Sequence, residues 1–355
     1  MKKFCHHLFA YCFLSSYAFA VGPEDSSPHV IVEELTPADK YPAPWFTGPL
    51  LTPSGHVIPY GYYDVEPYFF YNTVNGEYDS DWDSSSIPHD FTVANVQVPV
   101  FIGITEWMNF LFVPSVSWNS TEGISDFVFN DFVFEADVQI IHDTEENSLP
   151  GLKIYAQELF PSGHYQKRDP DKLGTDIGGR GTYETTLGFV VTRLHHVYKT
   201  QYFAWRLNGF WRIPCKVDVK GINAYGGAPD TDARVKPGQT YGLLGGVEYS
   251  LSQNWALACD AFAVYHNKTS FTGFPGTEDG MPADLGNPSS FQFSLAPAIE
   301  YMFSERLGVI GGVWFTLAGR NTDRFVNGVI AVNYFGEYRS APEHKFRSSG
   351  GGASP

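Results

Sequence analysis

The sequence lacks several features that would place it in common protein classes. After residue 20, no apolar run approaches the roughly 20 residues that a membrane-spanning helix needs, which argues against a helical membrane protein. Cysteines are few and their spacing fits no metal site, so we expect no metal and no other cofactor. Charged residues make up only 17% of the chain, and the formal net charge of −16 argues against a nucleic-acid partner, which would favour a basic surface.

The first 20 residues have the pattern of an export signal. Lys2 and Lys3 give a positive start, a largely apolar stretch follows, and residues 18–20 (Ala-Phe-Ala) match a signal-peptidase site. We predict cleavage after residue 20, which removes two of the four cysteines. An exported protein could join the remaining Cys215 and Cys259. We favour no disulfide, because one cysteine falls in a loop and the other on an outward-facing strand position.

The sequence is rich in aromatic residues, at 16% of the chain, and in a regular alternation of apolar and polar positions. Between residues 60 and 338 we find twelve segments with this period of two, which is the pattern of β-strands. A tilted strand needs about 9–11 residues to cross a bilayer, whereas strands of soluble proteins usually have about 5–6. The longer length fits these segments, which are 60–74, 91–104, 106–119, 127–141, 151–161, 181–194, 200–213, 239–251, 254–268, 290–303, 306–317 and 324–338.

Two further patterns favour a membrane barrel over a soluble β-sandwich or lectin-like protein, in which strands also alternate. Aromatic residues flank several apolar faces, as at the two interfaces of a membrane barrel: Tyr241 and Tyr249, Trp255 and Tyr265, Phe291 and Tyr301. Connections alternate between tight turns and long loops, the long ones being 75–90, 162–180, 214–238 and 269–289. We therefore predict an all-β fold, a closed antiparallel transmembrane β-barrel of about 12 strands.

Two regions lie outside the predicted barrel. Residues 21–59 form an irregular N-terminal extension rich in Pro, Ser and Thr, and residues 339–355 form a disordered C-terminal tail. Residues 44–53 are unusually apolar, and their prolines and glycines exclude a regular helix. We interpret this stretch as a plug, with a periplasmic lid or packing on the first strand as alternatives. Its candidate residues are Trp45, Phe46, Leu50 and Leu51.

Charged residues fall on the faces opposite the apolar ones, which would point into a lumen, because charge is costly against lipid at mid-bilayer. The candidate lumen-lining residues are Asp131, Glu135, Asp137, Arg206, Arg212, Glu248, Asp260 and Glu300. Singly they are best explained as ion pairs that fill the interior. As a group, the two arginines facing the first three acids are a candidate selectivity element. Glu158 falls on the outward face of 151–161, which predicts a bulge there or an early end.

No enzyme is predicted from this sequence. Outer-membrane phospholipases use a nucleophilic serine, a neighbouring histidine and a polar residue that orients it. No such set occurs here at a recognisable spacing, and Ser162 and His164 fall in a predicted outer loop. A lipid hydrolase at the barrel rim therefore ranks third among the functions we consider.

Three stretches resemble a known family over roughly residues 60–338. These are Gly123 to Phe127 (Gly-Ile-Ser-Asp-Phe), Leu159 to His164 (Leu-Phe-Pro-Ser-Gly-His), and Gly246 to Leu251 (Gly-Val-Glu-Tyr-Ser-Leu) followed by Asn-Trp. They are similar to outer-membrane proteins grouped with the meta-pathway of phenol degradation. The resemblance implies transport of small, often hydrophobic compounds, and it implies no catalytic residue.

These patterns lead to one main functional hypothesis and one rival. We expect a channel or transporter for small, possibly hydrophobic solutes in the outer membrane of a Gram-negative-type bacterium. Its partners would be outer-membrane lipid and a small-molecule solute, and an even strand number would place both termini in the periplasm. The rival is a surface barrel that displays its long loops for adhesion or structure. The pattern specifies no particular solute and no oligomeric state.

Overall fold

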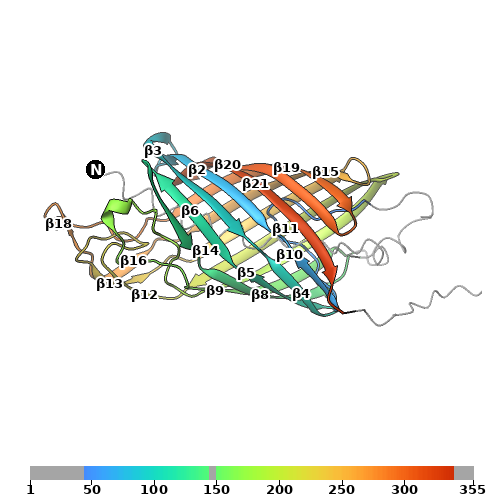
Figure 1. Ribbon diagram of the computed structural model, residues 1–355, viewed down its shortest axis with the longest axis horizontal. Coiled ribbons are helices and arrows are strands. Elements are labelled where there is room, and N and C mark those ends of the chain that lie inside the picture. The colour runs from blue at the N-terminus through green and yellow to red at the C-terminus, as the bar shows by residue number, and fades with distance from the viewer. Residues whose placement is uncertain (1–43, 144–148, 340–355) are drawn as a thin grey trace, which may run out of the picture.

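The computed structural model describes residues 44–143 and 149–339, so the predicted export signal and most of the C-terminal tail lie outside the described residues. Twelve antiparallel passes close into a barrel (Figure 1), which confirms the predicted fold class. Closure joins the first pass to the last, because Tyr62 to Val65 pair with Glu337 to Tyr334. None of the helices in the described ranges is long and apolar enough to cross a lipid bilayer.

The barrel strands account for most of the described chain. The first four passes contain two strands each: β1 (Tyr62–Val65) and β2 (Tyr68–Tyr78), β3 (Ser84–Gln97) and β4 (Val100–Thr105), β5 (Met108–Val113) and β6 (Ser115–Thr121), β7 (Ile124–Phe129) and β8 (Phe132–Ile141). The other eight are single strands: β9 (Gly151–Phe160), β10 (Glu184–Tyr198), β11 (Gln201–Pro214), β14 (Thr240–Ser250), β15 (Trp255–His266), β19 (Ser290–Ser304), β20 (Leu307–Arg320) and β21 (Thr322–Glu337).

The two faces of each strand match the alternation in the sequence. On β19, Ile299 and Phe303 are exposed on the outside, whereas Ser294 and Glu300 are buried inside. The outside of the barrel is therefore apolar along its length. Glu158 does face outward, but the expected bulge is wrong, because β9 and β10 pair in unbroken register around it. It accepts a hydrogen bond from Thr185 two residues before β9 ends, where an outward charge is less costly.

The breaks in the first four passes lie at Pro67, Pro99, Pro114 and the Asn130–Asp131 pair. Proline has no N–H to donate to a β-ladder, so it interrupts a strand where it occurs. Of the strands that these breaks separate, β2, β3, β6 and β7 pair with one another in that order, and β7 is the last strand of the series. β9 pairs with β8 rather than with β7.

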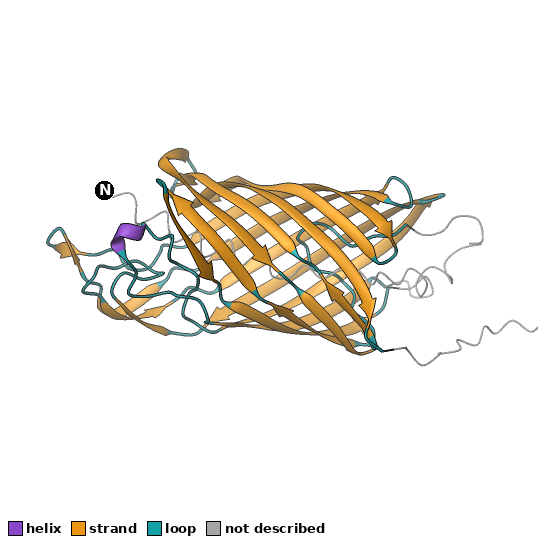
Figure 2. Ribbon diagram, viewed as in Figure 1, coloured by secondary structure: helices purple, strands orange, loops and turns teal. Residues whose placement is uncertain are grey.

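The two ends of the barrel differ, as Figure 2 shows. At one end, the short-turn end, strands are joined mostly by tight turns, such as those at 199–200 and 305–306. At the opposite end, the long-loop end, lie the short helix η1 (Pro170–Lys172) and five small strands: β12 (Val217–Lys220), β13 (Asp232–Lys236), β16 (Ser270–Phe274), β17 (Thr277–Glu278) and β18 (Met281–Pro282). Three of them, β12, β13 and β16, form an antiparallel sheet that we call the cap sheet.

The long loops differ from the expectation in two ways. The predicted loop 75–90 is mostly strand, because β2 and β3 keep pairing past a bulge near Gly76 and leave a turn of only 79–83. Serine and aspartate dominate that hairpin, so its sequence shows no apolar alternation. The loops 214–238 and 269–289 contain the cap sheet. Cys215 and Cys259 are free, in agreement with the expectation.

Candidate functional site

The interior of the barrel holds a stretch of chain that is not part of its wall. Residues 44–59, which we call the inner segment, run inside the barrel just before β1 begins (Figure 2). Leu50 and Leu51 are almost fully buried and Phe46 nearly so, whereas Trp45 is only partly covered. The segment begins at the short-turn end, where the Trp45 N–H donates to the Gln253 carbonyl.

Two carboxylates on one wall hold the inner segment. Asp260 of β15 accepts from the Leu51 N–H at 3.2 Å, and from the Thr52 N–H and hydroxyl at 2.9 and 2.5 Å. Glu300 of β19 accepts from the Thr47 N–H at 2.8 Å and from its hydroxyl. Hydrogen bonds to a buried carboxylate are stronger than those between neutral groups. These two acids therefore fix the middle of the segment to β15 and β19.

The far end of the segment is held by amide side chains on the opposite wall. Gln139 of β8 accepts from the Val57 N–H at 3.0 Å and donates to the Gly55 carbonyl at 3.1 Å. Asn109 of β5 accepts from the Ile58 N–H at 3.1 Å. The segment thus crosses the interior from β15 and β19 to β5 and β8.

Glycines on the inner wall make room for the segment. A Cβ on Gly246 would lie 2.6 Å from the Pro49 ring, and one on Gly312 would lie 2.9 Å from the Leu50 side chain. A Cβ on Gly103 would overlap the Pro59 carbonyl. Contacts this close force a neighbouring atom to shift, so a larger residue at these positions would press on the segment or on the adjacent wall.

Further acidic side chains lie near the inner segment in the half of the barrel toward the short-turn end. Glu248 pairs with Arg206 at 3.2 Å, and the Arg206 guanidinium lies against Gly48 of the segment. Asp64 and Glu66 share the side-chain amide of Asn333, which donates to both at 2.8 and 2.9 Å. Acidic groups therefore outnumber basic ones next to the segment.

A polar wall occupies β8 to β11. Lys153 pairs with Asp137 at 2.9 Å, and Glu184 contacts Arg180 at 2.6 Å and Arg212 at 3.7 Å. Glu135 is buried on the same wall. The ion pairs seen for Arg206 and Arg212 thus go to Glu248 and Glu184 on adjacent strands, rather than to Asp131, Glu135 or Asp137. Their predicted role as a selectivity group remains a prediction.

The opposite wall, on β2, β3, β15, β20 and β21, is lined by buried apolar side chains, which the sequence did not lead us to expect. Its members include Phe70, Phe91, Val93, Phe262, Val264, Trp314, Phe325 and Val329. The rings of Phe262, Trp314 and Phe325 lie 5.4 and 4.9 Å apart in succession. Apolar residues occur on both faces of 306–317 and 324–338, and that pattern was the available signal. We call these residues the apolar wall.

A second stretch of chain enters the barrel from the long-loop end. Residues 163–182, the inward loop, are largely buried from Thr175 to Arg180. The Asp131 carboxylate accepts the backbone N–H of Gly163 and that of Arg180, both at 2.8 Å, and so joins the two ends of this loop. The predicted lumen-lining residue Asp131 therefore binds backbone of the chain itself.

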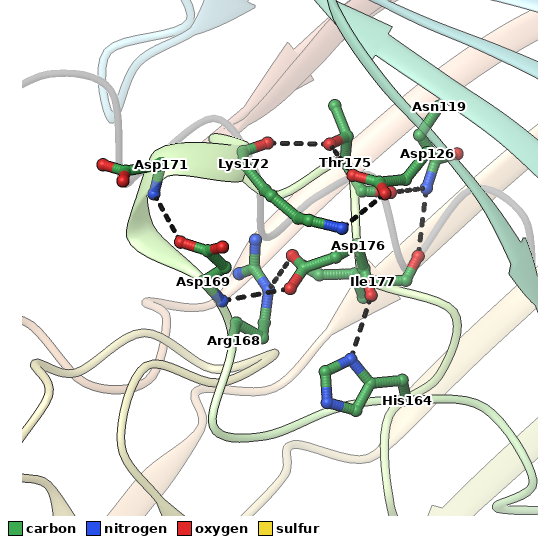
Figure 3. Close-up of polar contacts among 10 residues, drawn as sticks. All are labelled: Asn119, Asp126, His164, Arg168, Asp169, Asp171, Lys172, Thr175, Asp176 and Ile177. Atoms are coloured by element: carbon green, nitrogen blue, oxygen red, sulfur yellow. Dashed lines mark hydrogen bonds and ion pairs between the residues drawn. The ribbon is translucent and has the colours of Figure 1, made fainter.

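Side chains of β6 and β7 hold the middle of the inward loop (Figure 3). Asn119 donates to the carbonyls of Thr175 and Ile177, at 2.9 and 3.0 Å. Asp126 accepts from Lys172 at 2.6 Å and from the Thr175 hydroxyl at 2.7 Å. This hydrogen bond to Asp126 raises the pKa of the Lys172 ammonium group. The loop thus covers the inner side of the strand pair that ends in β7.

Apolar contacts run without a break from the cap sheet to the inner segment. One cluster of buried side chains joins Val217, Val219 and Val235 of the cap sheet to Ile177, the apolar wall and finally Leu50 and Leu51. The opposite face of the cap sheet carries exposed ion pairs such as Lys220 with Asp232. Within the described ranges, no three His, Cys, Asp or Glu side chains are grouped as a metal site would need.

Comparisons with known proteins bear on the fold. No family model matches the sequence, and no curated protein matches it. An outer membrane channel from Pseudomonas putida F1 has a similar structure, with a TM-score of 0.59 and 13% identity over 80% of this chain and 98% of that one. The NanC porin has a TM-score of 0.39 and 10% identity over 76% of this chain and 98% of that one. The translocator domain of the autotransporter NalP from Neisseria meningitidis has a TM-score of 0.35 and 11% identity over 77% of this chain and 88% of that one. The first likeness shows an outer-membrane barrel fold, and the other two are too distant to add to it.

Proposed function

We propose that this chain is an outer-membrane channel for small, largely apolar solutes, and that the inner segment closes it at the short-turn end. The observation that supports this most directly is the continuous apolar cluster from the cap sheet to Leu50 and Leu51. A barrel that only needed filling could use ion pairs throughout, as the polar wall does. An apolar wall facing a polar one instead gives an apolar solute a surface to contact along the interior.

The other parts of the structure would each have a role in such a channel. The apolar outside of the barrel would contact outer-membrane lipid, and the long-loop end would face the exterior, as longer loops do in such barrels. The inward loop and cap sheet would then control entry, and the inner segment would control exit to the periplasm. The exported, outer-membrane location and the family resemblance noted above are part of this proposal.

A reversible lock on the inner segment tests the proposal. The pair Pro49→Cys and Gly246→Cys removes the ring atom that lies closest to Gly246. The two Cβ positions are 3.1 Å apart, so a small outward shift of the segment brings them to the roughly 3.5–4.5 Å of a disulfide. Cys215→Ser and Cys259→Ser remove the native thiols. We expect the oxidised protein to take up a small aromatic hydrocarbon into vesicles at least about tenfold more slowly than the reduced one, since movement of the segment limits passage.

The control is the same protein with Pro49→Cys alone, which keeps Gly246 and should respond to neither oxidant nor reductant. Deletion of residues 21–55 should raise uptake, because it removes most of the segment. Equal uptake by the locked, reduced and deleted proteins, at the level of empty vesicles, would contradict a channel function.

A further inference from the structure

The contacts that hold the inner segment are of one chemical kind in its middle and of another at its far end. Toward β5 and β8 the wall offers the neutral amides of Asn109 and Gln139. Toward β15 and β19 it offers carboxylates, and every hydrogen bond that Asp260 receives from the segment comes from a donor N–H or O–H. An amide keeps its acceptor oxygen at any pH, whereas a carboxyl group loses acceptor capacity when it takes up a proton.

On this basis we propose that Asp260 and Glu300 form a proton-sensitive latch, which holds the inner segment when both are ionised and releases it when they are protonated. This inference rests on the proposed function, in which the segment closes the channel. The acid response would be confined to the middle of the segment, since its far end is held by amides.

Both oxygens of Asp260 take part in the latch, which makes the latch dependent on the ionised form. Oδ2 accepts the Leu51 N–H, and Oδ1 accepts both donors of Thr52. A proton on either oxygen turns an acceptor into a donor that faces another donor. Glu300 uses one oxygen, Oε1, for both donors of Thr47. Protonation there replaces a charged acceptor by a neutral one, and hydrogen bonds to charged groups are about twice as strong.

Other titratable and charged groups surround the latch. They are Asp64 and Glu66 of the first pass, Tyr68 of β2, Arg206 of β11 as the basic member, and Glu248 of β14, which pairs with Arg206. Of these acids, Asp260 and Glu300 accept hydrogen bonds from the segment, so their protonation is the event that acts on it.

The test uses a thiol placed within the segment. Ser54→Cys changes a side chain that is 1% exposed, in a background with Cys215→Ser, Cys259→Ser and His56→Gln. His56 is replaced because it is the titratable side chain of the segment itself. The reporter is labelled by a small thiol reagent at about pH 8 and about pH 5. Rates are divided by those of a protein that keeps the exposed Cys215 alone, which corrects for the chemistry of the thiol.

We expect the corrected labelling rate to rise at least about tenfold from pH 8 to pH 5, as one linked protonation can change an equilibrium tenfold per pH unit. Asp260→Asn with Glu300→Gln should raise the rate at pH 8 and remove most of the pH dependence. Asp323→Asn is the matched control, since it replaces a buried inward acid on β21 away from the segment and should leave the pH response intact. Thr47→Val with Thr52→Val removes only the hydroxyl donors and should give an intermediate rate.

A corrected rate that is the same at both pH values in the parent protein would overturn the latch, as would an unchanged pH response in the double carboxamide variant. If the carboxamide variant fails to fold, the parent pH response and the threonine pair still decide the question. The outcome is separable from the proposed function: a lock that blocks uptake together with pH-independent labelling rejects the latch alone. Acid-dependent labelling, together with uptake by the locked, reduced and deleted proteins that stays at the level of empty vesicles, rejects the channel and keeps the latch.

Discussion

Single glycines decide whether the inner segment and the wall can share the interior. Gly103 is the sharpest case, because a Cβ there would overlap the backbone carbonyl of Pro59, and backbone cannot move aside as a flexible side chain can. Its neighbours Ile58 and Phe101 are buried in one small cluster with Leu111. A methyl group at Gly103 would therefore displace the end of the segment from β4.

We expect Gly103→Ala to lower the free energy of unfolding by about 1–3 kcal/mol, the usual cost of forcing extra volume into a packed interior. Gly328→Ala is the control, since a Cβ on Gly328 meets no atom within 4 Å. Urea unfolding of the refolded protein, followed by tryptophan fluorescence, measures both. Equal unfolding midpoints for the two variants would show that the segment shifts to make room for the methyl group at residue 103.

Among whole elements, the inward loop depends on one carboxylate at its base. Asp131 lies at the break between β7 and β8 and binds the N–H groups of Gly163 and Arg180. Hydrogen bonds to charged groups contribute roughly 1.5–3 kcal/mol each, so loss of the charge would free both ends of the loop.

Asp131→Asn should speed tryptic cleavage within the loop at least about tenfold, because a change of about 1.4 kcal/mol in the opening equilibrium corresponds to that factor. Cleavage would occur at Lys167, Arg168 and Lys172, and mass spectrometry of the fragments would identify the sites. Asp171→Asn, an exposed acid in the same loop, should leave the rate unchanged. Equal rates for both variants would show that other contacts, such as those of Asn119, suffice.

Elements were predictable from the sequence to the extent that one side of each strand faces an apolar exterior. Alternation alone identified β19 and assigned Ile299 outward and Glu300 inward. It failed for the start of β3, where Ser84 to Ser86 extend the hairpin among polar residues that need no apolar partner. It also missed the cap sheet, whose strands are only four or five residues long and separated by glycines.

Contacts inside the barrel were less predictable, because they depend on which strands become neighbours. Arg206 pairs with Glu248 since β11 lies beside β14, although a long loop separates the two in sequence. The contact of Thr52 with Asp260 spans 208 residues and follows from closure of the barrel, which no local pattern encodes. The sequence indicated the inner segment as a whole through its apolar composition, without indicating its partners.

At the scale of the whole molecule, the interior has an apolar side and a polar side about half a turn apart. The apolar wall centres on β20 and β21, and the polar wall on β9 and β10, six passes away in the closed order. A solute that contacts Phe262 and Trp314 would therefore face the ion pairs of Lys153 and Glu184 across the barrel. Such an interior would separate solutes by apolar surface rather than by charge alone.

We expect Phe262→Asn to reduce vesicle uptake of a small aromatic hydrocarbon about tenfold, because full burial of such a side chain contributes about 1.5–3 kcal/mol. Ion conductance across planar bilayers should change little. Gln157→Asn on the polar wall serves as the control and should leave hydrocarbon uptake unchanged. A parallel fall in conductance and uptake for Phe262→Asn would mean that the variant narrows the barrel rather than altering what it binds.

The inner segment enters and leaves the barrel at the same end. Residue 44 lies by the turn at Gln253, and Pro59 lies by β4 and the closing pair of β1 and β21. The segment can therefore slide out without being threaded past any strand, and no ladder of the wall has to separate. A pull on the chain ahead of Trp45 would break its bonds one after another, first to Gln253, then to Glu300, then to Asp260. A load applied at this side would therefore peel the segment from the wall one contact at a time, ending at the amides of Gln139 and Asn109.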